Sequence, residues 1–157
     1  MKKYRQYATL NLSQVAQEVL AAWTQIQAFE ASLTLRENAP SYIFFEGPPS
    51  ANGLPGIHHV MARTIKDAIC RYRTQKGYRV ERKAGWDTHG LPVELGVEAM
   101  LGITKEDIGK KISIEEYNQA CRKEVMKYTD KWRQLTERMG YWVDLDQPYV
   151  TYHTKYI

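Results

Sequence analysis

The sequence predicts an α/β fold built on one β-α-β unit, with a helix before the unit and a long helix after it. A short apolar run at residues 42–45 is typical of a buried strand. Residues 57–75 place apolar side chains on one helical face, and residues 78–80 and 82–85 then indicate a second strand with a local irregularity. Because a crossover helix joins parallel strands, both strands should end at the same edge of one sheet.

The helix before this unit is expected at residues 11–30, where apolar residues recur at spacings of three and four. Its predicted apolar face consists of Val15, Val19, Trp23, Ile26 and Phe29. A polar link ending at Pro40 follows it. We therefore divide the chain into a helical appendage, residues 1–40, and an α/β unit, residues 41–157.

The helix after the unit is expected to begin at Ser113, because Ser113 and Glu116 have the spacing of a capping box. Its apolar stripe runs without interruption to Met139, which predicts one long helix packed on the core. The stripe consists of Tyr117, Cys121, Val125, Tyr128, Trp132, Leu135 and Met139. Residues 141–152 are aromatic and rich in turn formers.

The composition is that of an ordinary globular domain, with 157 residues of which 43% are hydrophobic and 25% charged. No apolar run approaches the roughly 20 residues that a membrane span needs, so we expect no membrane partner. No apolar signal segment follows the basic residues 1–6, which favours a cytoplasmic location. Cys70 and Cys121 lack the spacing of metal ligands, and we expect both to be free thiols.

Two polar loops follow the predicted strands. The first, residues 46–59, reads Glu-Gly-Pro-Pro-Ser-Ala-Asn-Gly-Leu-Pro-Gly-Ile-His-His. The second, residues 85–94, reads Gly-Trp-Asp-Thr-His-Gly-Leu-Pro-Val-Glu. Ligands of open α/β sheets bind beyond the carboxyl ends of the strands, so the two loops are expected to meet at one site. The first loop lacks the Gly-Lys-Ser/Thr of a P-loop, but it leads into the positive N-terminal end of a helix, which suits phosphate.

Together the two loops resemble those of the class I aminoacyl-tRNA synthetases, in their isoleucyl form. The first loop is similar to the segment that leads into the family's His-Ile-Gly-His element, and the second has the isoleucyl sequence of the family's second loop. The resemblance covers the chain from about Tyr7 to Ile157. It implies a partial Rossmann-like catalytic domain that activates isoleucine with ATP to isoleucyl-adenylate and transfers isoleucine to tRNA(Ile).

The resemblance also implies roles for individual residues. His58 and His59 would be catalytic, acting as donors to the phosphates. The residues expected to bind ATP, together with its accompanying Mg²⁺, are Asn52, Gly53, Gly56, His58 and His59. The residues expected to bind the amino acid are Gly47, Pro48, Asp87 and His89. Asp87 and the Pro48 carbonyl would bind the α-ammonium group, because a sheltered carboxylate forms strong charge-assisted bonds. No metal site of the protein's own is predicted.

The first loop departs from the family pattern at two positions. Residues 56–59 read Gly-Ile-His-His, so the family's first histidine is replaced by Gly56 and its glycine by His58, whereas His59 matches the retained histidine. His58 would then be either a relocated phosphate donor or a structural residue at the helix start.

Other roles remain open for the residues of the second loop and for the histidines as a set. Asp87 would be a turn residue, Trp86 a packing residue, and His89 a residue that only orients its loop. A zinc site made of His58, His59, His89 and Cys70 lacks the usual ligand spacing.

A basic stretch at residues 62–83 holds eight Lys or Arg residues against Asp67 and Glu81. It would form either a surface that attracts ATP or the tRNA end, or an ordinary solvated helix face. The basic residues are Arg63, Lys66, Arg71, Arg73, Lys76, Arg79, Arg82 and Lys83.

The resemblance implies that the chain stops before the family's editing insertion and before the half of the catalytic fold that carries its Lys-Met-Ser-Lys-Ser loop. We therefore expect these 157 residues alone to be catalytically inactive. The alternative function is a non-catalytic module that binds a nucleotide or an amino acid. A basic RNA-binding helical module is a weaker alternative, because it leaves the Pro/Gly/His loops unexplained. Continuation of the reading frame to the Lys-Met-Ser-Lys-Ser loop would favour the enzyme.

Overall fold

The computed structural model describes residues 9–157 and confirms the α/β class. Residues 1–8 lie outside the described residues. They are the start of the predicted appendage and include the basic residues 1–6. The helices are α1 (Leu12–Gln25), α2 (Ala28–Thr34), α3 (Ile57–Gln75), α4 (Leu91–Leu101), α5 (Ile114–Val125) and α6 (Thr129–Met139). The strands are β1 (Lys83–Trp86) and β2 (Asp144–Val150), and two short 3₁₀ turns are η1 (Lys105–Asp107) and η2 (Thr154–Tyr156).

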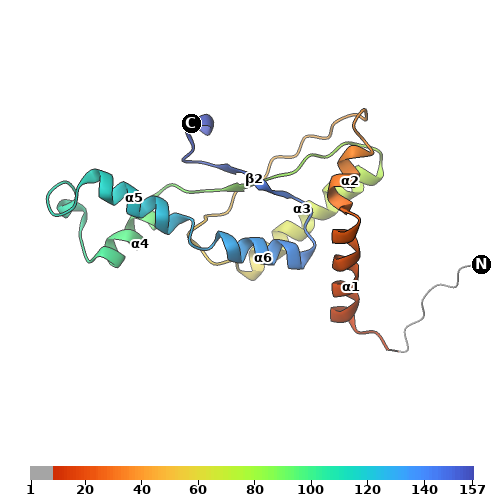
Figure 1. Cartoon of the computed structure of the whole chain (residues 1–157), viewed down its shortest axis with the longest axis horizontal. Coiled ribbons are helices and arrows are strands. Elements are labelled where there is room, and N and C mark those ends of the chain that lie inside the picture. The colour runs from red at the N-terminus through yellow and green to blue at the C-terminus, as the bar shows by residue number, and fades with distance from the viewer. Residues whose placement is uncertain (1–8) are drawn as a thin grey trace, which may run out of the picture.

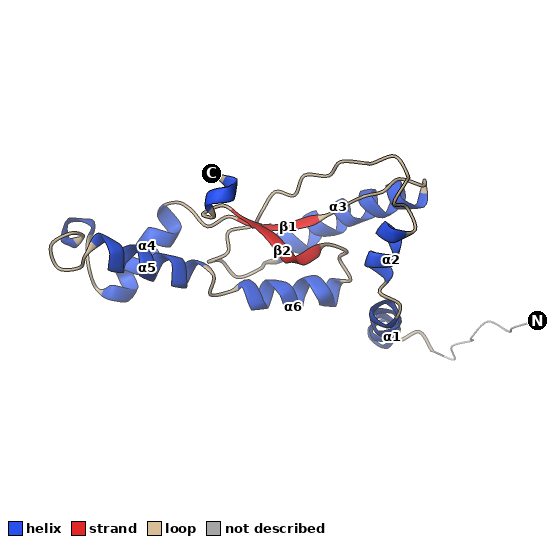
Figure 2. Cartoon of the chain, turned by 45° about the horizontal axis from the view of Figure 1, so that its top comes forward, coloured by secondary structure: helices blue, strands red, loops and turns tan. Residues whose placement is uncertain are grey.

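The molecule is elongated around a small central sheet (Figure 1). Helices α4 and α5 extend to one side of the strands, and α1 and α2 lie at the other side. Strands β1 and β2 are parallel, with Gly85 opposite Tyr149 and Trp86 opposite Val150 (Figure 2). The register shifts between Lys83 and Gly85, so the predicted irregularity of this strand is confirmed.

Residues 42–45 do not form the predicted buried strand. The chain here runs parallel to residues 79–87, but only isolated bridges join them, from Ser41 to Arg79 and from Ser50 to Asp87. Ile43 and Phe45 are 72% and 87% exposed instead of buried, because neither side chain has a neighbouring layer of the described structure to pack against. The bridges nevertheless keep the segment parallel to β1, and α3 is the crossover between them, as predicted.

The predicted helix at residues 11–30 is two helices. Gln27 adopts a left-handed conformation, with φ of 47°, and separates α1 from α2. The break lets Trp23 of α1 and Phe29 of α2 both pack on Trp142, with ring centroids 5.4 and 6.3 Å apart. Two other members of the predicted apolar face, Val19 and Ile26, are exposed.

The predicted long helix also breaks, between α5 and α6 at residues 126–128. Its start is correct, since the Ser113 hydroxyl accepts the Glu116 N–H at 3.1 Å and the Glu116 carboxylate accepts the Ser113 N–H at 3.0 Å. Val125 and Trp132, on the two sides of the break, both enter one core cluster. That cluster consists of Ala51, Trp86, Val93, Val125, Trp132 and Val150.

Two elements were missed by the sequence analysis. Residues 141–152 contain β2 rather than turns alone, and α4 was not predicted. The signals for α4 were present, because Pro92 stands in its first turn and Gly102 follows its last residue with φ of 65°. Gly77 ends α3 with φ of 94°, as predicted.

The basic stretch at residues 62–83 is not an ordinary solvated helix face, whereas its attraction for ATP or the tRNA end stays a prediction. The side chains of Arg63 and Arg82 are buried. Arg71 lies between two rings, 4.5 Å from Trp23 and 3.9 Å from Trp142, and also bonds Asp67 at 2.6 Å. The long side chains thus stabilise contacts between α3 and the elements around it, by ion pairs and by cation–π packing.

Candidate functional site

The two polar loops meet at the carboxyl end of β1, as predicted. The Asp87 N–H donates to the Pro49 carbonyl, and the Ala51 N–H donates to the Asp87 carbonyl, both at 2.9 Å. The second loop is also fixed to the end of β2, because the Thr88 hydroxyl lies 2.7 Å from the Thr151 hydroxyl. The loops therefore form one hydrogen-bonded unit at the edge where α/β proteins bind ligands.

His59 lies in the first turn of α3 and helps to cap it. Its Nδ1 accepts the Gly56 N–H at 2.9 Å, so the proton of the neutral ring is carried by Nε2. Desolvation by burial lowers the pKa of His59, and electrostatic interactions with His58 and Arg63 lower it further. The lowered pKa favours the neutral imidazole, whose Nε2–H is a donor at the positive end of the helix.

Gly56 and the ring of His58 lie close together. The ring of the exposed His58 packs on that of His59, with centroids 3.8 Å apart. A Cβ added at Gly56 would lie 2.9 Å from His58 Cε1 and 3.1 Å from His58 Nδ1. A side chain at residue 56 would therefore meet this ring in its present position, although the exposed His58 side chain can rotate away.

Asp87 is half-buried between the loops, and its carboxylate has a local partner. Oδ1 accepts the His89 N–H at 3.3 Å, which is the contact of an Asx turn. The turn interpretation of Asp87 therefore has support, and it leaves room for a binding role because a carboxylate has two oxygens and several acceptor positions. Trp86, one residue earlier, is buried in the core cluster, which confirms its packing role.

Gly85 is the residue that lets the first loop approach the sheet. A Cβ there would lie 3.0 Å from Pro48 Cβ and 3.2 Å from Tyr149 Cδ1, and neither proline nor strand can yield easily. We expect Gly85→Ala to destabilise the fold by about 1–3 kcal/mol, the usual cost of overpacking. Urea unfolding would measure the loss, with Gly96→Ala as the control because the space around Gly96 is open. Equal stability of the two variants would contradict the tight contact.

Comparisons with known proteins identify the family. A sequence profile described as tRNA synthetases class I (I, L, M and V) matches residues 18–157. The chain belongs to this family. It is 67% identical over 156 residues to the isoleucine–tRNA ligase of Porphyromonas gingivalis, a match that covers 99% of this chain and 14% of the relative. It is 65% identical to the isoleucine–tRNA ligase of Bacteroides thetaiotaomicron, a match that covers 99% of this chain and 13% of that relative.

A more distant relative, isoleucine–tRNA ligase 2 of Bacillus cereus, is 53% identical over 135 residues, which are 86% of this chain and 13% of the relative. The chain therefore spans about one seventh of the length of the curated relatives it matches.

The structure places the residues expected at the site as follows. Asn52 and Gly53 are half-buried in the first loop, and Gly56 is the N-cap of α3, separated from the two histidines by Ile57. Pro48 packs beside Gly85, whereas Gly47 and His89 are exposed. Their roles toward ATP and isoleucine remain predictions.

One support of the first loop was missed by the sequence analysis. The Glu46 side chain is buried and pairs with Lys66 of α3, and it accepts the Tyr141 hydroxyl at 2.5 Å. Burial raises the pKa of Tyr141 well above its ordinary value, and the hydrogen bond to Glu46 adds to the effect. Glu46 thus anchors the start of the first loop to α3 and to the end of α6. A lone carboxylate directly after an apolar run is the signal that indicates such an anchor.

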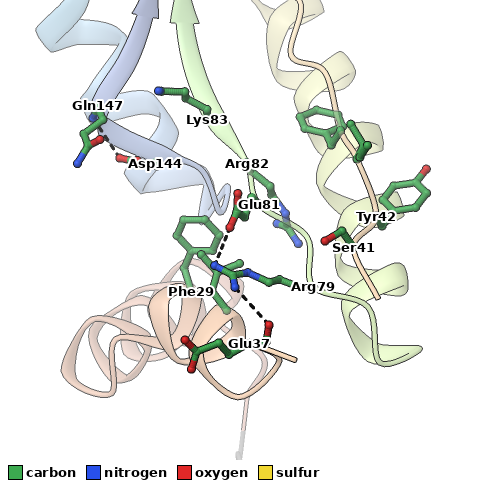
Figure 3. A pocket seen from close by; sticks show the side chains of 13 residues that line it. Phe29, Glu37, Ser41, Tyr42, Arg79, Glu81, Arg82, Lys83, Asp144 and Gln147 are labelled. Atoms are coloured by element: carbon green, nitrogen blue, oxygen red, sulfur yellow. Dashed lines mark hydrogen bonds and ion pairs between the residues drawn. The ribbon is translucent and has the colours of Figure 1, made fainter. Parts of the chain in front are cut away.

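A pocket of about 740 Å³ lies elsewhere, at the amino ends of the strands (Figure 3). Lys83 and Asp144, the first residues of β1 and β2, line it together with Ser41 and Arg79. Arg79 has partners within the pocket, because it pairs with Glu81 at 2.6 Å and donates to the Glu37 carbonyl at 3.4 Å (Figure 3). The pocket lies at the end of the sheet opposite to the loops, so it is not the candidate site.

Within residues 9–157, no group of three or more His, Cys, Asp and Glu side chains is placed to hold a metal ion. Cys70 and Cys121 are both free. No helix of the described part is long and apolar enough to span a membrane.

Proposed function

We propose that the two loops form part of the isoleucyl-adenylate site of an isoleucine–tRNA ligase. In this reaction the isoleucine carboxylate attacks the α-phosphate of ATP, the bond to pyrophosphate breaks, and isoleucyl-adenylate forms. The observation that carries the proposal is the pair of backbone hydrogen bonds between Asp87 and residues 49 and 51. These bonds place the candidate ammonium ligand of the second loop beside the loop that leads into His59.

ATP would lie over the first loop and the start of α3. The Nε2–H of His59 is available to a phosphate oxygen, because Nδ1 is occupied by the Gly56 N–H. The unpaired N–H groups and the positive end of α3 add a fixed field that favours negative charge. Mg²⁺ would arrive with ATP. Little covalent chemistry is required of the protein, since positioning and electrostatic stabilisation supply most of the rate in phosphoryl transfer.

Isoleucine would lie at the junction of the loops, with its ammonium group between the Asp87 carboxylate and the Pro48 carbonyl. The charge-assisted bond would exclude compounds that lack the amine. One methylene is worth only about 1–3 kcal/mol in a pocket, so discrimination against valine needs more than this site.

The complete activity belongs, in this proposal, to a cytoplasmic polypeptide of the relatives' length. That polypeptide would add the remaining catalytic half and would transfer isoleucine to tRNA(Ile). Residues 41–157 would be the first part of its catalytic domain, and residues 1–40 a helical appendage.

Asp87→Asn provides the test of the proposal. The measurement is isoleucine-dependent ATP–pyrophosphate exchange in a chimeric ligase, in which this chain replaces the matching segment of the Porphyromonas gingivalis enzyme. The asparagine side chain keeps the acceptor for the His89 N–H and loses only the charge. We expect isoleucine affinity to fall by about 2–5 kcal/mol, the cost of removing one partner of a sheltered charge pair, with a much smaller change for ATP.

The exposed Asp146→Asn is the matched control. Unchanged isoleucine affinity in Asp87→Asn would restrict Asp87 to its turn. A folded chimeric ligase without any exchange activity would contradict the proposed function and favour the non-catalytic binding module.

A further inference from the structure

Trp132 of α6 contacts both loops of the candidate site. It is 1% exposed, and its indole Nε1–H donates to the Gly53 carbonyl at 2.8 Å. Its ring meets the ring of His59 edge to face, with centroids 4.7 Å apart. It also meets Trp86, the residue before Asp87, at 6.3 Å. A single side chain that is distant from all three in sequence thus links the first loop, the start of α3 and the second loop.

Trp132 is itself held in place from two sides. The guanidinium of Arg63 lies 4.7 Å from the centre of the Trp132 ring, which is cation–π distance. Arg63 also donates to the Thr136 hydroxyl at 2.6 Å, and that hydroxyl donates to the Trp132 carbonyl at 2.7 Å. Because Arg63 follows His59 by one turn of α3, the indole is clamped against the same helix face that carries His59.

The partner of the indole N–H is informative. A buried tryptophan needs an acceptor for its N–H, and a core tryptophan usually finds one within its own packing environment. Here the acceptor is a backbone carbonyl of the loop, at a residue predicted to contact ATP. The bond therefore fixes the loop as well as the tryptophan.

We propose that Trp132 is a positioning residue for ATP. It fixes the position of the Gly53 backbone through the hydrogen bond and the orientation of the His59 ring through the aromatic contact. This inference rests on the proposed function, because it assigns a role within the same site. The indole N–H acts on the Gly53 side alone, whereas the ring acts on His59 and on Trp86. The two parts of the side chain can therefore be separated by substitution.

Trp132→Phe keeps an aromatic ring and removes the N–H, and Trp132→Leu removes both. In the chimeric ligase we expect Trp132→Phe to lower kcat/KM for ATP by about tenfold, which is the value of one net hydrogen bond. The KM for isoleucine should stay unchanged. Trp132→Leu should cost more and should affect both substrates, because Trp86 loses its ring contact as well.

Trp142→Phe is the matched control, since Trp142 packs on Arg71 and the N-terminal helices away from the loops. Its kinetics should equal those of the unsubstituted chimera. Thermal unfolding of each variant, together with calorimetric measurement of the ATP dissociation constant, separates loss of the loop geometry from loss of the fold.

Wild-type kinetics for Trp132→Phe would overturn the inference, and so would an equal loss for ATP and isoleucine, which is the pattern of a merely structural residue. Failure of the proposed function looks different, because the unsubstituted chimera would then show no exchange. In that case a weaker ATP dissociation constant in Trp132→Phe would still support the positioning role, and an unchanged constant would overturn it.

Discussion

His59→Ala is expected to lower the rate of isoleucyl-adenylate formation by about 10²–10³-fold in the chimeric ligase, which is the usual cost of removing one preorganised donor to a developing charge. Isoleucine binding should stay nearly intact, because the proposed role of His59 is toward the phosphates of ATP and not toward isoleucine. The substitution also removes the Nδ1 acceptor of the Gly56 N–H, so the start of α3 should loosen. Single-turnover formation of the adenylate measures the rate.

His58→Gly distinguishes two roles for the second histidine. It restores the family's usual residue while Gly56 remains. We expect a loss as large as that of His59→Ala, because a histidine gained at residue 58 beside one lost at residue 56 suggests a relocated phosphate donor. A smaller loss would mean that His58 only fills space. His153→Ala, at an exposed position, is the control. Intact rates in both site variants would remove the histidines from the mechanism.

The largest loss of stability is expected for Arg82→Met. The Arg82 side chain is buried and donates to Asp67 at 3.0 Å, and to the Thr74 hydroxyl and the Trp142 carbonyl at 3.2 Å each. Removing one partner of a buried ion pair typically costs about 3–5 kcal/mol. We expect about 3 kcal/mol, at the low end of that range, because Arg71 still pairs with Asp67.

Urea unfolding of the chain measures the change, with Lys83→Met at the exposed neighbouring position as the control. Surface substitutions of this kind stay within about 0.5 kcal/mol. A loss for Arg82→Met no larger than that of the control would show that the buried network around Asp67 contributes nothing to stability.

Periodicity predicted the elements whose packing is local. The bounds of α3 match the prediction residue for residue, and Gly77 ends it. Its predicted buried face is wrong, because Ile57, Met61, Ile65 and Tyr72 are 74%, 62%, 61% and 56% exposed. The residues that α3 buries are Arg63, Cys70 and Thr74. The uninterrupted stripe from Tyr117 to Met139 did not reveal the break at residues 126–128. Val125 and Trp132 are seven residues apart and enter one cluster, so the stripe would look the same in a broken and in an unbroken helix. Strand β2 was missed because its pairing partner is about 60 residues away.

The candidate site was predictable where the loops themselves carry the chemistry. The meeting of the loops at Asp87 and the place of His59 at the start of α3 agree with the sequence analysis. The supports of the site were not predictable. Trp132 was interpreted as one member of a core stripe, and Glu46 only as part of a motif, because their partners Gly53 and Tyr141 are distant in sequence.

The central claim is that the two loops bind one adenylate between them. A crystal structure of the chimeric ligase with a non-hydrolysable isoleucyl-adenylate analogue tests it most directly. We expect the phosphate group to accept a hydrogen bond from His59 Nε2 and the ammonium group to contact the Asp87 carboxylate. An analogue bound with its ammonium group away from Asp87, or bound in the pocket lined by Arg79 and Lys83, would contradict this account.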